Sequence, residues 1–265
     1  MIEARDLRVV VGPKLLLDGV SLAVRAGETL AVVGPNGAGK STLRKVISGE
    51  VQPSAGQVFM DQRALNDWPL TERAKVRAVM GQDSTLSFPF TVLEVVLMGR
   101  SPHLKGSESH RDYEIAREAL ELLEALHLEE RLYPTLSGGE RQRVQLARVL
   151  AQIWEAHDAR PRYLLLDEPT SNLDLSHQHS TLEVARRFAR EGVAVLVILH
   201  DLNLAAQYAD RLVLLKGGRV MAQGEPRSVL TREIIEESFA IPVIVTDHPL
   251  LKCPLVLPKG MRARD

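Results

Sequence analysis

The chain has 265 residues, of which 45% are hydrophobic, so it can bury a substantial core as one large domain or as two subdomains. Its 33 Lys and Arg residues nearly balance its 34 Asp and Glu residues, and the formal net charge of −1 supplies no general field for nucleic acid or acidic lipid. Aromatic residues make up only 4% of the chain, which argues against a base-stacking surface. We therefore expect a globular protein without a nucleic-acid partner.

The single cysteine, Cys253, excludes an intrachain disulfide and a multi-cysteine metal site, fits a reducing compartment, and is expected to be a small buried residue. Charged residues such as Glu3 and Arg5 argue against a secretory leader at Met1. The longest apolar stretches, such as Val193 to Leu199, fall far short of the roughly 18 residues that a membrane-spanning helix needs. We expect a cytosolic chain that reaches a membrane only through a partner.

The N-terminal region carries strand signals. From Ile2 to about Gly27 we predict short antiparallel strands, broken by Gly12-Pro13 and by Asp18-Gly19, that lead into a buried strand at Leu30 to Val33. A second set of strand and turn signals runs from Gly56 to about Met80.

A glycine-rich loop follows the buried strand and fits the GxxxxGK[ST] pattern in its strand-to-helix context. Glycines let successive backbone N–H groups point at anionic oxygens, and a helix that begins near Lys40 adds the positive end of its dipole. Lys40 then suits the β- and γ-phosphates, and Ser41 suits magnesium; glycines that serve only to turn the chain are the alternative. The sequence predicts nucleoside triphosphate binding by Gly34, Pro35, Asn36, Gly37, Ala38, Gly39, Lys40, Ser41 and Thr42.

A helical region occupies the middle of the chain. Between Glu108 and Glu130, apolar residues recur at spacings of four and three, which predicts one apolar helix face formed by Ala116, Leu120, Leu123 and Leu126. A second helix is predicted over Ser137 to Gln152. Because it is inserted between strand-rich parts, this region indicates a helical insertion in one α/β core.

The start of the second helix holds a candidate phosphate contact. Ser137 and Glu140 have the S-x-x-E spacing of a capping box, which accounts for these two residues structurally. It leaves the pair Gly138 and Gly139 unexplained, because each glycine at a helix start costs about 0.5–1 kcal/mol relative to alanine. That cost makes sense where the backbone must approach a phosphate closely, and both interpretations stay open.

Strands return after the helical region. Tyr163 to Leu166 and Ala194 to Leu199 are continuous apolar runs, as expected for a parallel sheet that is covered on both faces. A crossover helix is predicted at about Leu175 to Arg190, followed by a hairpin around Gly217-Gly218 and a short helix near Arg232 to Phe239.

Polar residues follow these strands at the edge where ligands of open α/β sheets collect. Asp167 and Glu168 end one strand, so that Asp167 can hold magnesium and Glu168 can activate the water that attacks the γ-phosphate. His200 follows the next strand, where a merely packed histidine is the alternative. Gln82 follows Ala78 to Met80 and could reach magnesium or the attacking water.

Taken in order, these elements resemble the ATP-binding cassette (ABC) ATPases: the phosphate loop, Gln82, the segment Leu136 to Glu140, the carboxylate pair, Asp174 and His200. The resemblance covers nearly the whole chain. It implies an α/β fold with a P-loop NTPase (RecA-like) core, an antiparallel β subdomain and an inserted α-helical subdomain. Residues 1–82 and 160–265 would form the catalytic core, and residues 83–159 the helical subdomain, within a single domain spanning 1–265.

The resemblance also implies roles and partners. Gln82 would couple nucleotide to a membrane-spanning partner, and His200 would contact the γ-phosphate. Ser137, Gly138 and Gly139 of one copy would close on ATP and Mg²⁺ held by another copy in a head-to-tail homodimer. Many members stack an aromatic residue on adenine, where this chain has Val11. Since such stacking is worth on the order of 1–3 kcal/mol in nucleic-acid systems, we expect modest discrimination between ATP and GTP.

Within this family, the chain resembles the ATPases of bacterial importers for haem, iron-siderophore complexes and vitamin B12 through the segments Phe88 to Arg100 and His200 to Ala206. The resemblance to haem importers is the strongest, through Ser87 to Phe90 and the loop Trp154 to Arg162. This implies two permease subunits, a periplasmic cargo-binding protein and a place at the cytoplasmic face of the inner membrane.

Phe88 and Phe90 are candidates for docking the permease, with core packing as the alternative. His177 and His179 lie two positions apart, do not share a helix face, and are expected to be solvated surface residues. Two alternative functions fit the sequence less well: a soluble ABC protein that acts on DNA or ribosomes, and a P-loop small-molecule kinase.

Overall fold

The computed structural model describes residues 1–81, 88–156 and 160–260. Its central element is a six-stranded sheet in the order β10-β9-β3-β8-β7-β6, in which all neighbours are parallel except the hairpin β9-β10. These strands are β3 Thr29–Val33, β6 Arg77–Met80, β7 Tyr163–Asp167, β8 Ala194–Ile198, β9 Arg211–Lys216 and β10 Arg219–Gly224.

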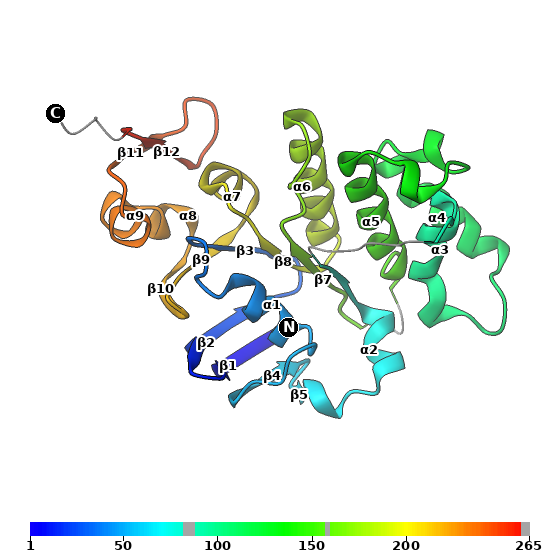
Figure 1. Ribbon diagram of the computed structural model, residues 1–265, viewed down its shortest axis with the longest axis horizontal. Coiled ribbons are helices and arrows are strands. Elements are labelled where there is room, and N and C mark those ends of the chain that lie inside the picture. The colour runs from blue at the N-terminus through cyan, green and yellow to red at the C-terminus, as the bar shows by residue number, and fades with distance from the viewer. Residues whose placement is uncertain (82–87, 157–159, 261–265) are drawn as a thin grey trace.

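The continuous apolar runs form strands of a sheet that is covered on both faces, as the sequence predicts. Leu30, Val32 and Leu196 lie in one buried cluster with helix α1 (Lys40–Ile47) and the N-terminal strands. Ala31, Val33 and Val195 point into a second cluster, together with helices α5 (Gly138–Gln152) and α6 (Leu175–Arg190). Figure 1 shows the sheet between these two layers.

The N-terminal strands form a separate antiparallel sheet in the order β2-β1-β4-β5. Its strands are β1 Ile2–Val11, β2 Lys14–Val24, β4 Ala55–Met60 and β5 Arg63–Ala64. The expected break at Asp18-Gly19 is wrong: it is a bulge within β2, where the register shifts between the pairs Leu7↔Val20 and Val9↔Leu17. A bulge keeps the strand continuous while it bends.

The segment from Gly56 to Met80 holds a short helix that the strand and turn signals miss, α2 (Leu70–Val76). Only Val76 of this helix is buried, so no apolar periodicity marks it. The 3-10 helix η1 (Leu65–Asp67) precedes it.

Helices gather beyond the β6 edge of the sheet (Figure 1). They are α3 Val92–Leu97, η2 Met98–His103, α4 His110–Leu122, η3 Leu126–Leu128, η4 Tyr133–Thr135 and α5. The predicted long helix over 108–130 ends at Leu122, and its apolar face is otherwise as expected, with Ala116, Leu120 and Leu123 buried. We refer to α3 through α5 as the helical segment.

The C-terminal part contains helices α7 Leu202–Tyr208, α8 Pro226–Val229 and α9 Arg232–Phe239, and a hairpin of β11 Val243–Asp247 with β12 Pro254–Pro258. The crossover helix, the Gly217-Gly218 hairpin and the helix at Arg232 agree with the sequence prediction, but the β11-β12 hairpin is not anticipated. Within the described ranges, no helix is both long enough and apolar enough to cross a membrane. Cys253 is buried, as expected.

Candidate functional site

The glycine-rich loop connects β3 to α1 and needs its glycines for two distinct reasons. Gly34 has φ +149°, and a Cβ there would lie 2.2 Å from the Leu215 carbonyl oxygen. Gly39, the residue before α1, has φ +100°, and its Cβ would lie 2.7 Å from the Leu16 carbonyl oxygen. Gly37 has φ +76° with no atom nearby. The loop thus combines a left-handed backbone with close contacts to β2 and β9, which only glycine allows.

Lys40 is the first residue of α1 and is buried. Its ammonium donates to the carbonyl oxygens of Gly34 at 2.7 Å and Pro35 at 3.0 Å. Burial lowers the pKa of Lys40, while the carboxylates of Glu168 and Asp167 act in the opposite direction. The ammonium therefore lies inside the loop, where the oxygens of a bound phosphate can replace the two carbonyl groups.

An open hollow surrounds this loop. Its lining contains Leu16, the residues Asn36 to Thr42, Glu168 and His200. The parallel order of β3, β8 and β7 accounts for this gathering, because the carboxyl ends of all three strands meet at one edge of the sheet. The loop, the acidic residue and the histidine that the sequence marks separately thus form one site.

Asp167 is the last residue of β7, and it is 1% exposed. Its Oδ2 accepts from Nε of Arg44 at 3.1 Å, whereas its Oδ1 has no hydrogen-bond partner among the described residues. Burial raises the pKa of Asp167, against the charge of Arg44 and the nearby Ser41 hydroxyl, which lower it. An unpartnered carboxylate oxygen next to the Ser41 hydroxyl is the oxygen-rich donor set that Mg²⁺ prefers, so these residues fit that ion.

Glu168 and His200 form a close pair. The Nε2 atom of His200 lies 2.5 Å from Oε1 of Glu168. The His200 side chain is 50% exposed. Glu168 itself has φ +52°, a left-handed conformation that non-glycine residues rarely adopt and that is often held at functional sites. Its carbonyl oxygen accepts from Ser171 Oγ at 2.9 Å and from Gln142 Nε2 at 3.2 Å, and these bonds hold the strained turn.

The glycine pair of α5 lies in a different hollow. That hollow is lined by Ser137 to Glu140, Arg143, Asn172, Leu173, Asp174 and His177, and among the described residues it shares none with the hollow around Lys40. Ser137 and Glu140 form the expected capping box. Asp174 caps α6 and accepts from the backbone N–H of His177 at 2.9 Å. A single copy of the chain thus holds two separate halves of the predicted nucleotide site.

The structure adds a packing reason for one of the two glycines. A Cβ at Gly139 would lie 3.2 Å from the carbonyl oxygen of Asn172, which is tight, whereas a Cβ at Gly138 would meet nothing closer than 3.6 Å. The need for glycine at position 139 therefore follows from close packing against Asn172 of the same chain, whereas the sequence by itself indicates the approach of a phosphate. Gly138 remains exposed and without such a reason.

The histidine pair differs from the sequence interpretation, and the phenylalanine pair divides between its two alternatives. His177 and His179 are partly buried, and each has a partner: His177 Nδ1 lies 2.8 Å from Asp174 Oδ1, and His179 Nδ1 lies 2.8 Å from the Tyr208 hydroxyl. They are therefore not freely solvated. Phe88 is 70% exposed, whereas Phe90 packs against the core, so the two rings differ in exposure although their centroids are only 6.2 Å apart.

Two further predictions, and one residue that the sequence did not mark, concern the surroundings of the hollow. Gln82 lies outside the described residues. Val11 is 59% exposed at the end of β1 and does not line the hollow; Leu16 of β2 does. Sequence reasoning also missed Arg44, although its place one helical turn after Lys40 puts it on the same face of α1.

One half is a phosphate loop with strand-end carboxylates, and the other is a capped glycine tip on an inserted helix. Together they define a P-loop nucleotide-binding cassette. The family model described as ABC transporter matches residues 17–171. The chain belongs to this family, and it is an ATP-binding ATPase of the ABC type.

Curated relatives cover nearly the whole chain. It is 61% identical to the hemin import ATP-binding protein HmuV of Gloeobacter violaceus, over 98% of this chain and 94% of that protein. It is 51% identical to the protein of the same name from Pseudomonas aeruginosa, over 97% of this chain and 99% of that one.

Solved structures agree on the fold. A transporter described as of the metal-chelate ABC type, in an inward-facing conformation, aligns with a TM-score of 0.81 at 28% identity, covering 98% of this chain and 97% of that one. A dimeric bacterial ABC transporter cassette aligns with a TM-score of 0.74 at 28% identity, covering 85% of this chain and 98% of that one.

Proposed function

We propose that this chain is the ATPase subunit of a bacterial importer and that it energises the uptake of haem across the inner membrane. The observation that carries the ATPase part is that the Lys40 loop and the Ser137 tip line two hollows with no described residue in common, as expected for two halves of a nucleotide site. The choice of haem is supported by relatives that are named hemin import ATP-binding proteins and that are up to 61% identical over nearly the whole chain.

In the proposed reaction, the loop N–H groups and Lys40 bind the phosphates of ATP. Glu168 orients a water molecule on the γ-phosphate and accepts its proton as the P–O bond to ADP breaks. His200, which lies 2.5 Å from Glu168, contacts the γ-phosphate and fixes the carboxylate. Ser41, Asp167 and Gln82 would hold Mg²⁺, which neutralises phosphate charge when bound.

A second copy would complete the site. Ser137 and Gly138 are exposed at the N-terminal end of α5, where backbone N–H groups and the helix dipole favour a phosphate. Since the hollow around these residues is separate from that around Lys40 in one copy, we infer a head-to-tail homodimer in which each tip closes on the other copy's ATP. The dimeric cassette among the similar structures supports this arrangement.

The remaining partners follow from the proposed transporter. Two permease subunits would contact the cassette near Gln82 and the exposed ring of Phe88, and a periplasmic protein would deliver cargo to them. The chain would then lie at the cytoplasmic face of the membrane. We also propose residues 83–159 as the helical subdomain and residues 1–82 and 160–265 as the catalytic core.

One test separates the two halves of the site. In a Glu168→Gln background, which slows hydrolysis, ATP should convert the chain to a dimer in size-exclusion chromatography. Adding Gly138→Glu should abolish that dimer while the single copy keeps its affinity for a fluorescent ATP analogue, because the nearest atom to a Cβ at Gly138 is 3.6 Å away. Loss of nucleotide affinity in the Gly138→Glu monomer would mean that one copy holds the whole site.

Cargo needs a separate experiment. The chain, reconstituted with its permease, is tested with binding protein loaded with haem, with an iron-siderophore complex or with vitamin B12. We expect haem to give the strongest stimulation of hydrolysis. The similar structure of metal-chelate type favours an iron-siderophore complex as the second candidate. If only that complex, or only vitamin B12, stimulated hydrolysis, the proposal of haem as the cargo would be wrong and that compound would be the cargo instead.

A further inference from the structure

The C-terminal end of α5 lacks the usual means of ending a helix. Its C-cap residue, Ile153, has φ −116° instead of a left-handed glycine, and the last turn contains no basic residue of its own. Carbonyl oxygens of the last turn nevertheless need partners, because they have none within the helix. The backbone N–H of Ile153 binds the Leu150 oxygen, and other elements of the fold bind the oxygens of Ala151 and Gln152.

Side chains from two directions bind carbonyl groups at this helix end and just beyond it. Arg100 donates to the Ala151 oxygen at 2.8 Å, and His103 Nε2 lies 2.7 Å from the Gln152 oxygen; both come from η2. Arg162, the residue before β7, donates to Ile153 at 2.9 Å and Trp154 at 2.7 Å. The guanidinium groups of Arg100 and Arg162 at this end also match the helix dipole.

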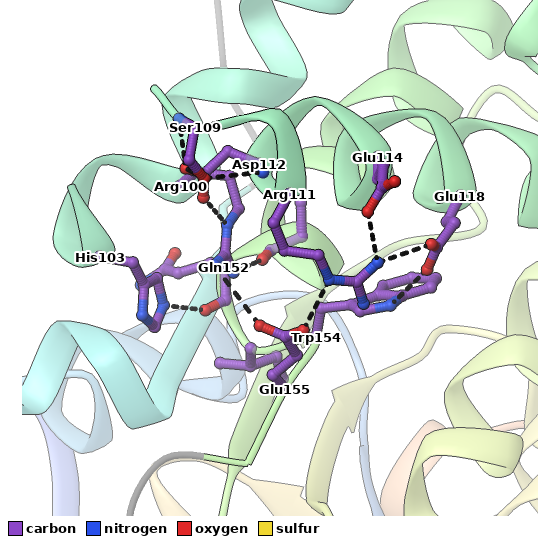
Figure 2. Close-up of polar contacts among 12 residues, drawn as sticks. Arg100, His103, Ser109, Arg111, Asp112, Glu114, Glu118, Gln152, Trp154 and Glu155 are labelled. Atoms are coloured by element: carbon purple, nitrogen blue, oxygen red, sulfur yellow. Dashed lines mark hydrogen bonds and ion pairs between the residues drawn. The ribbon is translucent and has the colours of Figure 1, made fainter. Parts of the chain in front are cut away.

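Figure 2 shows that Arg100 joins this helix end to a second helix. Its Nε donates to Asp112 Oδ1 at 2.9 Å, and the other carboxylate oxygen of Asp112 accepts from Ser109 at the start of α4. Arg100 and Asp112 are 4% and 7% exposed. A Cβ at Gly99 would lie 2.1 Å from the Arg148 carbonyl oxygen, so η2 lies directly on α5. The base of the helical segment is therefore one rigid unit.

One side chain of that unit reaches across to the sheet. Gln152 Nε2 donates to the carbonyl oxygens of Ala74 in α2, at 2.7 Å, and of Arg77 at the start of β6, at 3.0 Å. β6 pairs in parallel with β7 from Arg77↔Tyr163 to Met80↔Leu166, so its far end lies beside Asp167 and leads to Gln82. Gln152 thus connects the base of α5 to the strand that precedes Gln82.

We propose that Gln152 is a positioning residue for ATP hydrolysis, which sets the angle between α5 and the sheet and thereby places the Ser137 tip. The inference rests on the proposed closure of that tip on ATP held by a second copy. α5 has 15 residues and is about 22 Å long. A tilt of about 3° at its base moves the tip by about 1 Å, and a misplacement of that size can cost up to about 100-fold in rate.

The test uses the full chain with three variants. Gln152→Glu keeps the size of the side chain but replaces the amide donors with carboxylate oxygens that face two carbonyl groups. Gln152→Arg restores donors. The matched control is Arg111→Gln, since Arg111 binds Glu155, Glu118 and Glu114 in the same cluster through side chains that are nearly half exposed and reach no element of the sheet.

We expect Gln152→Glu to lower kcat and to weaken ATP-dependent dimerisation in the Glu168→Gln background by about tenfold or more. The affinity of the monomer for the ATP analogue should stay unchanged, and Gln152→Arg should regain most of the loss. Arg111→Gln should match the wild type. Thermal unfolding of each variant shows whether a loss merely reflects destabilisation.

Three results would overturn the proposal: a wild-type kcat in Gln152→Glu, a loss explained fully by unfolding, or a failure of Gln152→Arg to restore activity. The parent Glu168→Gln protein distinguishes the failure of this inference from that of the proposed function. If the parent forms no dimer with ATP, the closure itself is wrong; if the parent forms a dimer and Gln152→Glu matches it, only the role of Gln152 is wrong.

Discussion

The buried pair of Arg100 and Asp112 permits a quantitative prediction about stability. Asp112→Asn keeps the size of the side chain and an oxygen that can accept from Ser109, so the cap of α4 is retained. What the variant loses is the negative charge beside a guanidinium group that is 4% exposed. We expect it to lower the free energy of unfolding by about 2–4 kcal/mol at pH 7.

The magnitude follows from the carboxyl group itself. Burial of Asp112 opposes ionisation, but hydrogen bonds from Ser109 and the ion pair with Arg100 outweigh it and lower the pKa from 3.8 to about 2. At about 1.4 kcal/mol per pKa unit, the folded state favours the ionised group by about 2.5 kcal/mol. Leaving one charge of a buried pair without its partner typically costs about 3–5 kcal/mol, and the middle of that span, about 4 kcal/mol, is the upper end of the expected range.

The pH dependence has a definite sign. Because the folded-state pKa is lowered, this stabilisation is fully present above the unfolded value of 3.8 and is lost as the pH falls toward 2. Urea unfolding of the wild type and of Asp112→Asn at several pH values isolates the group, since the variant lacks it. The difference in unfolding free energy should shrink by about 1 kcal/mol between pH 5 and pH 3.

An exposed ion pair provides the control. Asp247 binds Arg227, but their side chains are 74% and 56% exposed, so Asp247→Asn should change the unfolding free energy by less than about 1 kcal/mol. The reasoning is refuted if Asp112→Asn is as stable as that control, or if its difference from the wild type is the same at pH 5 and pH 3.

Three further predictions concern other parts of the chain. Gly34→Ala should abolish binding of an ATP analogue, measured by fluorescence, because its Cβ would lie 2.2 Å from the Leu215 carbonyl oxygen; normal affinity would contradict the account of the loop. Asn203 bonds both the N–H and the C=O of Val256, at 2.8 and 3.1 Å, so Asn203→Leu should destabilise the β11-β12 hairpin by about 2 kcal/mol, seen as faster amide hydrogen exchange there; unchanged protection would contradict it. Val11 is 59% exposed and does not line the hollow around Lys40, so Val11→Tyr should leave the ratio of ATP to GTP affinity unchanged in nucleotide competition; a shift of about tenfold toward ATP would mean that this position does stack on adenine.

The elements that the sequence predicts well are those whose requirements are local. The loop from Gly34 to Thr42, the capping box at Ser137 and the crossover helix Leu175–Arg190 each depend on backbone geometry or apolar spacing within a few residues. Short elements without such a pattern escape prediction. Helix α2 has a single buried residue, and the strands β11 and β12 are held in part by Asn203, which lies about 50 positions earlier.

The sequence by itself determines that this chain binds nucleotide, because a phosphate loop needs only a short run of residues after a buried strand. The tertiary structure decides which side chains share a site. Arg44 meets Asp167 across 123 positions, and Gln152 meets Ala74 across 78. It also places the Lys40 loop and the Ser137 tip in separate hollows. Such contacts depend on how strands are ordered in the sheet and on how helices pack against it, and no local pattern of residues encodes either.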